Sequence, residues 1–350
     1  MGAPKRPQCT RIAVSYYIET AFGQSFNDSA ITKLFPPNEP VLLDVVQARE
    51  DDSTIIKGHE FPVDTDADVI VAQDVSMPFN FRGYLNLLGW LFSLVGGTDS
   101  VTGTGTAYSE HTFKIQDACI IDQPPSTNVI TSFVGDTASY YKMKGMCLNE
   151  LKIAIDKPGV PTVSGTFLTD GTVTCCGASY TPPTAITAAD VLAGIYSDIQ
   201  MCNYGGSLAT KKTLFMGADF TINQNLDVAD GRLNFADSSK YLKNLRFGNR
   251  VVTLVLKMQG HQGDEFWVDF LAKTVKAIQL TVTLSASRSL EINIPKCTIA
   301  SIKQSFNGIR DMNEITYKAY FESTGSLNSP WEVVIRNGDA AYLLPITPGM

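Results

Sequence analysis

The stretch VIVAQDVSMPFNFRGYLNLLGWLFSL at residues 69–94 returns in outline as VVTLVLKMQGHQGDEFWVDFLAKTV at residues 251–275. In each stretch a run of β-branched residues predicts a strand, and the apolar residues that follow predict a helix. We expect strands at residues 69–77 and 251–258 and helices at residues 84–94 and 264–275. The sequence is therefore predicted to contain two copies of one module.

The second part of each copy is a predicted hairpin that begins at a cysteine. Cys147 precedes Gly159 by 12 residues, and Cys297 precedes Gly308 by 11 residues. The two helices are 182 residues apart but the two cysteines only 150, so the first copy should carry an insertion of about 32 residues. A Gly-, Thr- and Ser-rich stretch at residues 96–128 fits that place and is expected to be a loop.

These patterns predict a mainly β (α+β) chain with few helices. The first module is expected at residues 1–180, including the insertion, and the second at residues 215–350. Residues 181–214 are expected to be a linker with a short helix at residues 188–199, after a Pro-containing boundary. The helices of the modules should be buried against sheet through their apolar stripes. The residues expected in these stripes are Leu88, Trp90 and Leu91 in the first helix and Phe266, Phe270 and Leu271 in the second.

Composition excludes several classes of protein. Of the 350 residues, 44% are hydrophobic and only 18% are charged, which excludes a disordered chain. A net charge of −7 argues against a surface that grips nucleic acid. The most apolar run, residues 85–95, is too short to span a bilayer. We interpret the seven cysteines as reduced and mostly buried.

No residue pattern predicts catalysis, a cofactor or a metal site. His111 follows Ser109 and Glu110 and is interpreted as a solvated loop histidine. The acidic residues 64–68 begin like a calcium loop, but the required Gly and Glu are absent. Ser139 and Lys142 match one motif of acyl-transfer enzymes without its companion motifs. We therefore expect no catalytic, cofactor-binding or metal-binding residues, and no enzyme.

The order of the repeated pieces resembles the tail tube (major tail) proteins of long-tailed bacteriophages, in the tandem form with two fused tube modules. The resemblance covers most of residues 10–340. It is carried by YSEHTF at residues 108–113, YKMKGMCLNELKI at residues 141–153, ADFTINQNL at residues 218–226 and LEINIPKC at residues 290–297.

This resemblance implies a structural virion protein whose modules are β-sandwiches or half-barrels, each with a flanking helix. Two modules per chain would close a pseudo-sixfold ring as a trimer, and stacked rings would form the tail tube. The implied partners are other copies of the chain, a tape-measure protein and viral DNA in the lumen without specific binding, and tail terminator and baseplate or tip proteins, with no membrane. Assembly would take place in the host cytoplasm. An acidic lumen wall would repel phosphates.

Two other classes of function stay open from the sequence. One is a β-rich capsid-decorating or carbohydrate-binding structural module, and the other is an enzyme with a diffuse site. For a tube protein, contacts between copies are expected in the N-terminal arm at residues 1–10, the loop at residues 96–108 and the segment at residues 228–240. The candidate residues are Pro4, Arg6, Thr98, Asp99, Thr102, Thr104, Asp230, Arg232 and Asp237.

Overall fold

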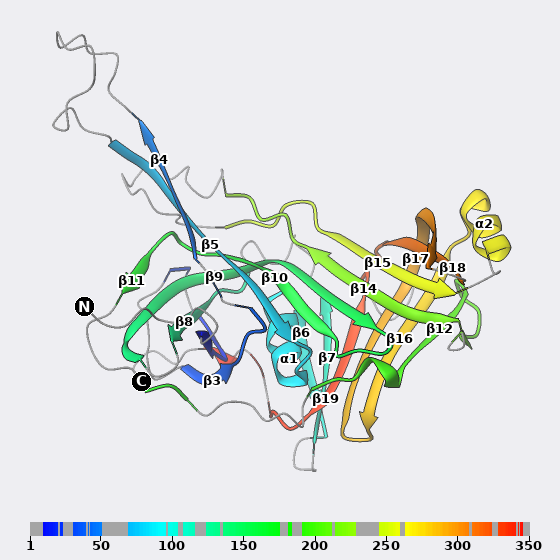
Figure 1. The fold of residues 1–350 in the computed structure, drawn as a ribbon, viewed down its shortest axis with the longest axis horizontal. Coiled ribbons are helices and arrows are strands. Elements are labelled where there is room, and N and C mark those ends of the chain that lie inside the picture. Colours follow the sequence, from blue (N-terminus) through cyan, green and yellow to red (C-terminus); the bar gives the residue numbers. More distant parts are fainter. Residues whose placement is uncertain are drawn as a thin grey trace, which may run out of the picture.

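The chain is mainly β in the computed structural model (Figure 1). The structure describes residues 10–19, 22–23, 31–39, 41, 43–50, 69–95, 97–103, 108–115, 124–133, 136–175, 181–183, 191–211, 214–228, 245–259, 263–307, 310–323, 328–340, 342 and 344–345. Within these residues, one antiparallel sheet of 18 strands dominates, together with two α-helices and a small parallel pair.

The elements follow one another along the chain with strands in the large majority. The first ten strands are β1 (Thr10–Ser15), β2 (Tyr17–Ile18), β3 (Ile31–Phe35), β4 (Asp44–Glu50), β5 (Val69–Arg82), β6 (Gly97–Thr102), β7 (Ser109–Ile115), β8 (Thr127–Phe133), β9 (Asp136–Asp156) and β10 (Thr162–Leu168). The others are β11 (Val173–Cys175), β12 (Ser197–Asn203), β13 (Ala209–Thr210), β14 (Phe215–Asn223), β15 (Val251–Gln259), β16 (Lys276–Ser285), β17 (Arg288–Asn307), β18 (Arg310–Ala319), β19 (Glu332–Asn337) and β20 (Leu344–Pro345). The helices are α1 (Leu85–Leu94), α2 (Gly263–Ala272) and a 3₁₀ turn, η5 (Gly194–Tyr196).

The central part of the large sheet is an unbroken series of antiparallel strands in the order β4-β5-β10-β9-β14-β15-β18-β17, which we call the central run. Side chains alternate across it, as the pleat of a strand requires. The buried face includes Met77, Phe79, Phe81, Leu151, Ile153, Ile155, Val163, Phe167, Phe220, Ile222, Leu254, Leu256, Met258, Ile315 and Tyr317. This run links early strands of the chain to late ones through the pairing of β9 with β14.

Helix α1 forms the centre of the core on the apolar face of this run. Leu88, Trp90 and Leu91 are buried. The Trp90 ring lies 5.6 Å from the ring of Phe167 on β10, and the Phe92 ring lies 6.4 Å from that of Phe220 on β14. Aromatic pairs at these centroid separations stabilise a core beyond the effect of area alone. The helix therefore packs against strands from both parts of the sequence.

Helix α2 differs from α1 because it lies at the edge of the molecule (Figure 1). Phe266 is buried and Phe270 is half-buried, but Leu271 is 77% exposed. The prediction that Leu271 is buried is therefore wrong. Its helix has apolar residues on two faces, and only the face with Phe266 meets the sheet.

The predicted helix at residues 188–199 is also wrong where the structure describes it. Residues 197–199 begin strand β12, whose Ser197, Ile199 and Met201 alternate inward against β16. Gly194 lies so close to Asp156 that a Cβ would stand 2.2 Å from the Asp156 carbonyl oxygen. The alternating burial of side chains along β12 and the close approach at Gly194 decide the structure here, and the weak apolar stripe that predicted a helix does not.

The stretch at residues 96–128 is not simply a loop. It contains the hairpin β6–β7 and the start of β8. Strand β7 also pairs with β19, residue 113 opposite residue 333. The Gly, Thr and Ser residues of β6 are typical of a loop, so composition did not predict this strand. Its stability comes from pairing with β7.

We predict that Leu91→Ala lowers the free energy of unfolding by about 2–5 kcal/mol, because it leaves a cavity in a closed core. The matched change Leu271→Ala should cost no more than about 0.5 kcal/mol in the isolated chain, because that side chain faces solvent. Chemical denaturation of both variants measures the difference, and equal losses would contradict the packing described.

Candidate assembly surface

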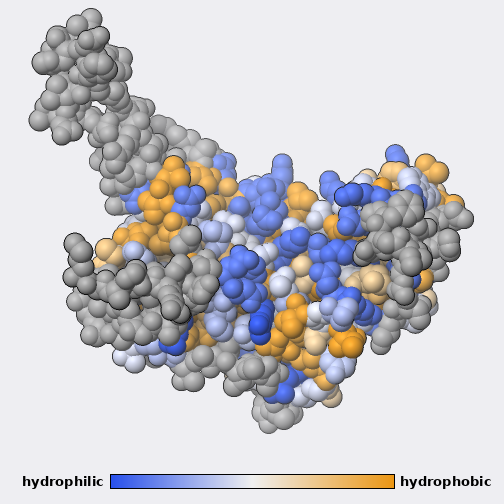
Figure 2. All heavy atoms as spheres, in the orientation of Figure 1, coloured by the Kyte–Doolittle hydropathy of each residue, from blue (hydrophilic) through white to orange (hydrophobic). Residues whose placement is uncertain are grey.

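The face of the central run that points away from α1 is polar. Its side chains include Asp74, Asn80, Arg82, Glu150, Lys152, Asp156, Thr162, Ser164, Thr166, Asp219, Thr221, Thr253, Lys257, Glu314, Thr316 and Lys318. Acidic and basic groups are nearly balanced, with hydroxyl groups between them. Hydrophilic side chains also spread over the middle of the molecule in Figure 2. Such a face offers neither a basic patch for phosphates nor an apolar pocket for a small ligand.

Ion pairs cross this face where β9 meets β14. Lys152 Nζ lies 3.1 Å from Asp219 Oδ2, and Lys257 Nζ lies 2.8 Å from Asp156 Oδ1 and 3.5 Å from Asp219 Oδ1. Partial burial works against the charge of Lys257, yet the hydrogen bond to Asp156 and the charge of Asp219 raise its pKa above the ordinary value. The alternating charges favour the register of the three strands.

A buried polar cluster around Asp339 joins the two ends of the chain. Asp339 Oδ2 accepts hydrogen bonds from Tyr16 Oη at 3.1 Å, Asn86 Nδ2 at 2.8 Å and Tyr342 Oη at 3.1 Å. Its Oδ1 accepts one from Lys33 Nζ at 2.8 Å. Burial raises the pKa of Tyr342 well above the ordinary value, so its hydroxyl stays a donor. The cluster therefore holds β3, α1 and the segment after β19 together.

His111 belongs to the same cluster and is not a solvated loop residue, which corrects the interpretation from sequence. Its side chain is fully buried on β7. Nδ1 lies 3.1 Å from Asp99 Oδ2, and Nε2 lies 2.9 Å from the Asp339 carbonyl oxygen. The strand pairing of β6, β7 and β19 creates this environment, which the local sequence does not show.

A second buried polar site lies beside β9 and contains the acidic pair Glu19 and Asp170. Glu19 Oε1 accepts a hydrogen bond from Gly145 N at 3.0 Å, and Asp170 Oδ1 accepts one from Thr172 N at 2.8 Å. Lys144 Nζ lies 3.5 Å from Asp170 Oδ2. Burial raises the pKa of both carboxyl groups despite these contacts. The pair lies at the region where β9 changes partners, and its charged form costs stability there.

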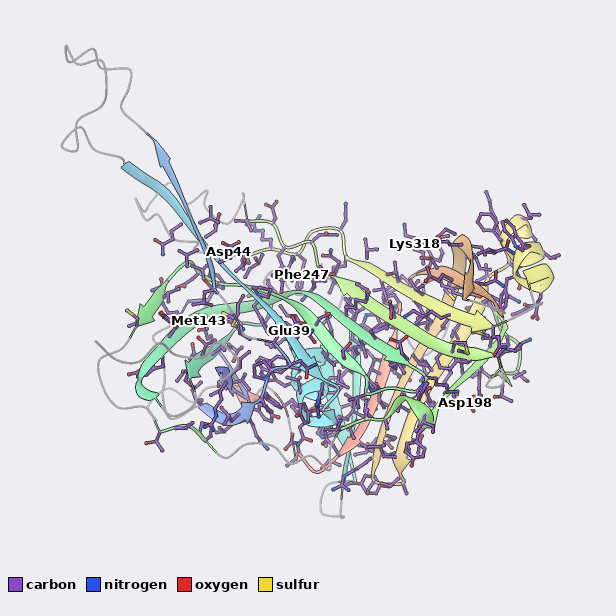
Figure 3. The ribbon with its side chains drawn as sticks, viewed as in Figure 1. Glu39, Asp44, Met143, Asp198, Phe247 and Lys318 are labelled. Atoms are coloured by element: carbon purple, nitrogen blue, oxygen red, sulfur yellow. The ribbon has the colours of Figure 1, made fainter. Side chains whose placement is uncertain are left out.

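The central run has two edges that no described strand covers. Strand β4 pairs only with β5, and residues 298–307 of β17 pair only with β18 among the described residues. Asp44 lies where the β4–β5 ribbon leaves the body, and Lys318, next to the other edge, lies on the opposite side of the molecule near α2 (Figure 3). Open edges of this kind are templates for pairing with another chain.

Exposed apolar side chains lie at the same two places, on both faces of β4 and on one face of α2. Val45 and Val46 on β4 are 47% and 55% exposed. On α2, Trp267, Val268 and Leu271 form an exposed apolar face. Apolar residues placed together on a surface indicate a site of protein contact. The sequence interpretation missed Val45 and Val46, although the apolar, Val-rich run VLLDVV at residues 41–46 could have predicted a strand.

The residues predicted as assembly contacts are only partly within the described chain. Asp99 is engaged by His111, and Thr102 Oγ1 lies 3.5 Å from Glu110 Oε1 within the β6–β7 hairpin. Thr98 is on β6, opposite residue 114 of β7. Removing residues 98–106 would delete most of β6 and leave His111 without Asp99, so we expect this segment to contribute to folding as well as to any contact between copies. Pro4, Arg6, Thr104, Asp230, Arg232 and Asp237 lie outside the described residues.

Within the described residues, His, Cys, Asp and Glu side chains form no group of three or more that could hold a metal ion. None of the described helices is long and apolar enough to cross a membrane.

The fold and its surface define a β-rich structural subunit with open sheet edges. A comparison with protein families gives a match to the family described as Phage tail tube protein over residues 10–309. The match covers most of the chain, so the chain belongs to the phage tail tube protein family. It is a structural part of the virion tail and not an enzyme, and tail tube proteins polymerise with themselves. No curated protein matches the sequence.

Replacing Asp339 should destabilise the fold strongly. We expect Asp339→Ala to lower the free energy of unfolding by about 3 kcal/mol or more, because Tyr16, Asn86 and Tyr342 lose a buried acceptor. Asp156→Ala, which removes a carboxylate that is largely exposed, should cost about 1 kcal/mol or less. Urea denaturation of both variants tests this, and a smaller loss for Asp339→Ala than for Asp156→Ala would refute it.

The buried acidic pair predicts a pH dependence. The pKa of Asp170 is raised on folding, so the stability that it contributes is present at acidic pH and lost as the pH rises through the folded pKa. Asp170→Asn removes this titration. The variant should therefore gain stability over wild type as the pH rises from about 4 toward neutrality. Urea unfolding over a pH series measures the gain, and a difference independent of pH would contradict the expectation.

Proposed function

We propose that this tail tube subunit consists of two tube modules and that three copies close a ring of pseudo-sixfold symmetry. Rings of this kind would stack into the conduit through which DNA is ejected. The observation that carries the proposal is the order of strand pairing, which repeats from the first part of the chain to the second.

The repeat extends over seven strand pairings in the first part of the chain, which contains strands β1 to β11, and seven in the second part, which contains strands β12 to β19. In the first part these are β1–β3, β1–β8, β4–β5, β5–β10, β10–β9, β9–β8 and β9–β11. In the second part the same pattern is β12–β13, β12–β16, β14–β15, β15–β18, β18–β17, β17–β16 and β17–β19. A helix follows β5 in one part and β15 in the other. Such agreement across a whole pairing pattern supports a duplication.

A matching irregularity supports the same correspondence. The pairing of β9 with β10 skips one residue between Leu148 and Glu150. The pairing of β17 with β18 skips one residue between Ile299 and Ser301. Bulges of this kind are structural features with a fixed place in a fold. They align Leu148 with Ile299, so β9 and β17 are counterparts.

The hairpin β6–β7 and the two-residue strand β2 are the elements of the first part that have no counterpart among the described residues of the second. The hairpin lies in the stretch expected to be an insertion. Strands β12 and β13, in the segment expected to be a linker, have counterparts in β1 and β3. We therefore assign residues 181–214 to the second module and retain a boundary near residue 180.

The polar face of the central run is a suitable wall for a conduit. Its near balance of charge and its hydroxyl groups give a phosphate backbone no cluster of cations to bind. We infer that this face lines the lumen, around a tape-measure protein during assembly and around DNA later. Tail terminator and baseplate or tip proteins would contact the ends of the tube.

Electron microscopy of the purified protein tests the ring. We expect rings or tubes in which three chains, and six similar densities, make one layer, because each chain supplies two modules. Native mass measurement of released rings should give three copies. Rings of six chains, or particles with no ring, would contradict the proposal.

A further inference from the structure

We propose that neighbouring chains join by strand pairing between the outer edge of β4 in one copy and residues 301–303 of β17 in the next. The register is antiparallel, with Val46 opposite Ser301, Val45 opposite Ile302 and Asp44 opposite Lys303. This inference rests on the proposed two-module ring, and it adds the surface through which copies recognise one another.

The template for the joint lies within one chain. Strand β14 of the second part pairs with β9 of the first, with Asn223 opposite Glu150, Ile222 opposite Leu151 and Thr221 opposite Lys152. This pairing joins the two parts edge to edge. A ring of alike modules repeats one kind of joint, so the contact between chains should copy the contact within the chain.

The residues of the joint between chains follow from comparing the hairpin β9–β10 with its counterpart β17–β18. The bulges align Glu150 with Ser301, and therefore Lys152 with Lys303. The same bulges make Phe167 on β10 the counterpart of Tyr317 on β18. Phe167 pairs with Met77 on β5, and Tyr317 pairs with Leu254 on β15, so Met77 is the counterpart of Leu254.

These matches transfer the register to the first strand of each hairpin. Ser76 is then the counterpart of Thr253. Asp44 pairs with Ser76, and Thr221 pairs with Thr253, so Asp44 is the counterpart of Thr221. Strand β4 in one copy therefore takes the place that β14 holds beside β9.

Both edges of this joint are open among the described strands of the single chain. Among the described strands, only β5 pairs with β4, and only β18 pairs with residues 298–307 of β17. The counterparts β14 and β9 are covered on both sides. An open strand edge beside a fully paired counterpart indicates that a further strand completes it.

The side chains of the two edges also fit. Ile222 and Leu151, the internal pair on the core face, are fully buried, whereas their counterpart Val45 is 47% exposed and Ile302 is only partly buried. On the other face, Asp44 would oppose Lys303, an attractive pair across strands. Lys303 is 76% exposed, with a distant contact of 3.8 Å to Glu314. The joint would therefore bury apolar surface and add an ion pair.

The exposed face of α2 is independent support for a neighbouring copy at this edge. Its counterpart α1 is fully buried and contacts β17 and β19 of the second part. The counterparts of β17 and β19 are β9 and β11. A next copy joined at β17 would bring its own β9 and β11 to α2, where Trp267, Val268 and Leu271 are exposed.

Disulfide trapping in assembled tubes tests the register. The pair Val46→Cys with Ser301→Cys should form disulfides between chains under mild oxidation. The matched control is Val45→Cys with Ser301→Cys, because Val45 is similarly exposed but points to the opposite face of the sheet. We expect at least roughly tenfold more crosslinked chain for the first pair, since only directly opposed Cβ atoms reach disulfide geometry. Single-cysteine variants give the background from the native thiols.

The crosslinked products also count the ring. Denaturing gels without reductant should show a ladder that ends at three chains. If either variant does not form tubes, Asp44→Cys with Lys303→Cys replaces the test pair and Val45→Cys with Lys303→Cys the control. Equal crosslinking of pair and control, or none in intact tubes, would overturn the joint while leaving the tube function in place. Failure of the wild-type chain to form rings would instead overturn the proposed function.

Discussion

The whole structure depends on the hydrogen-bonded ladder of strand β9. Its 21 residues are paired first with β8 and β11 and then with β10 and β14. Every buried peptide group must find a partner, so a strand covered on both sides fixes the strands around it. Through β14 the ladder extends into the second part of the chain, and α1 packs beneath the resulting sheet.

This constraint explains where the chain is closed and where it is open. The interior of the run is satisfied by its own strands, and the Asp339 cluster closes the far side by joining residues from both ends of the chain. Among the described residues, the open places are β4, the end of β17 and the outer face of α2. A subunit built for a polymer needs such edges, because full closure would leave no surface for a neighbour. The balanced polar face agrees with a structural role.

The strand-helix-hairpin pieces were readable from sequence because their signals are local. Residues 69–94 and 251–275 contain β-branched runs and apolar stripes with the periods of strand and helix. The family resemblance followed from their order, and the match over residues 10–309 confirms the family. Where the signal depended on partners, the sequence misled: residues 97–102 became a strand, and His111 became a buried residue between Asp99 and Asp339.

The sequence by itself determined the class of fold, the position of both helices and the absence of any recognisable catalytic motif, because these depend on residue type and short-range period. Only the tertiary structure decided which apolar residues are buried, as the contrast between Leu91 and Leu271 shows. It also decided which strand edges stay open. Burial and pairing depend on elements far apart in the chain, so residues with the same local pattern end in different surroundings.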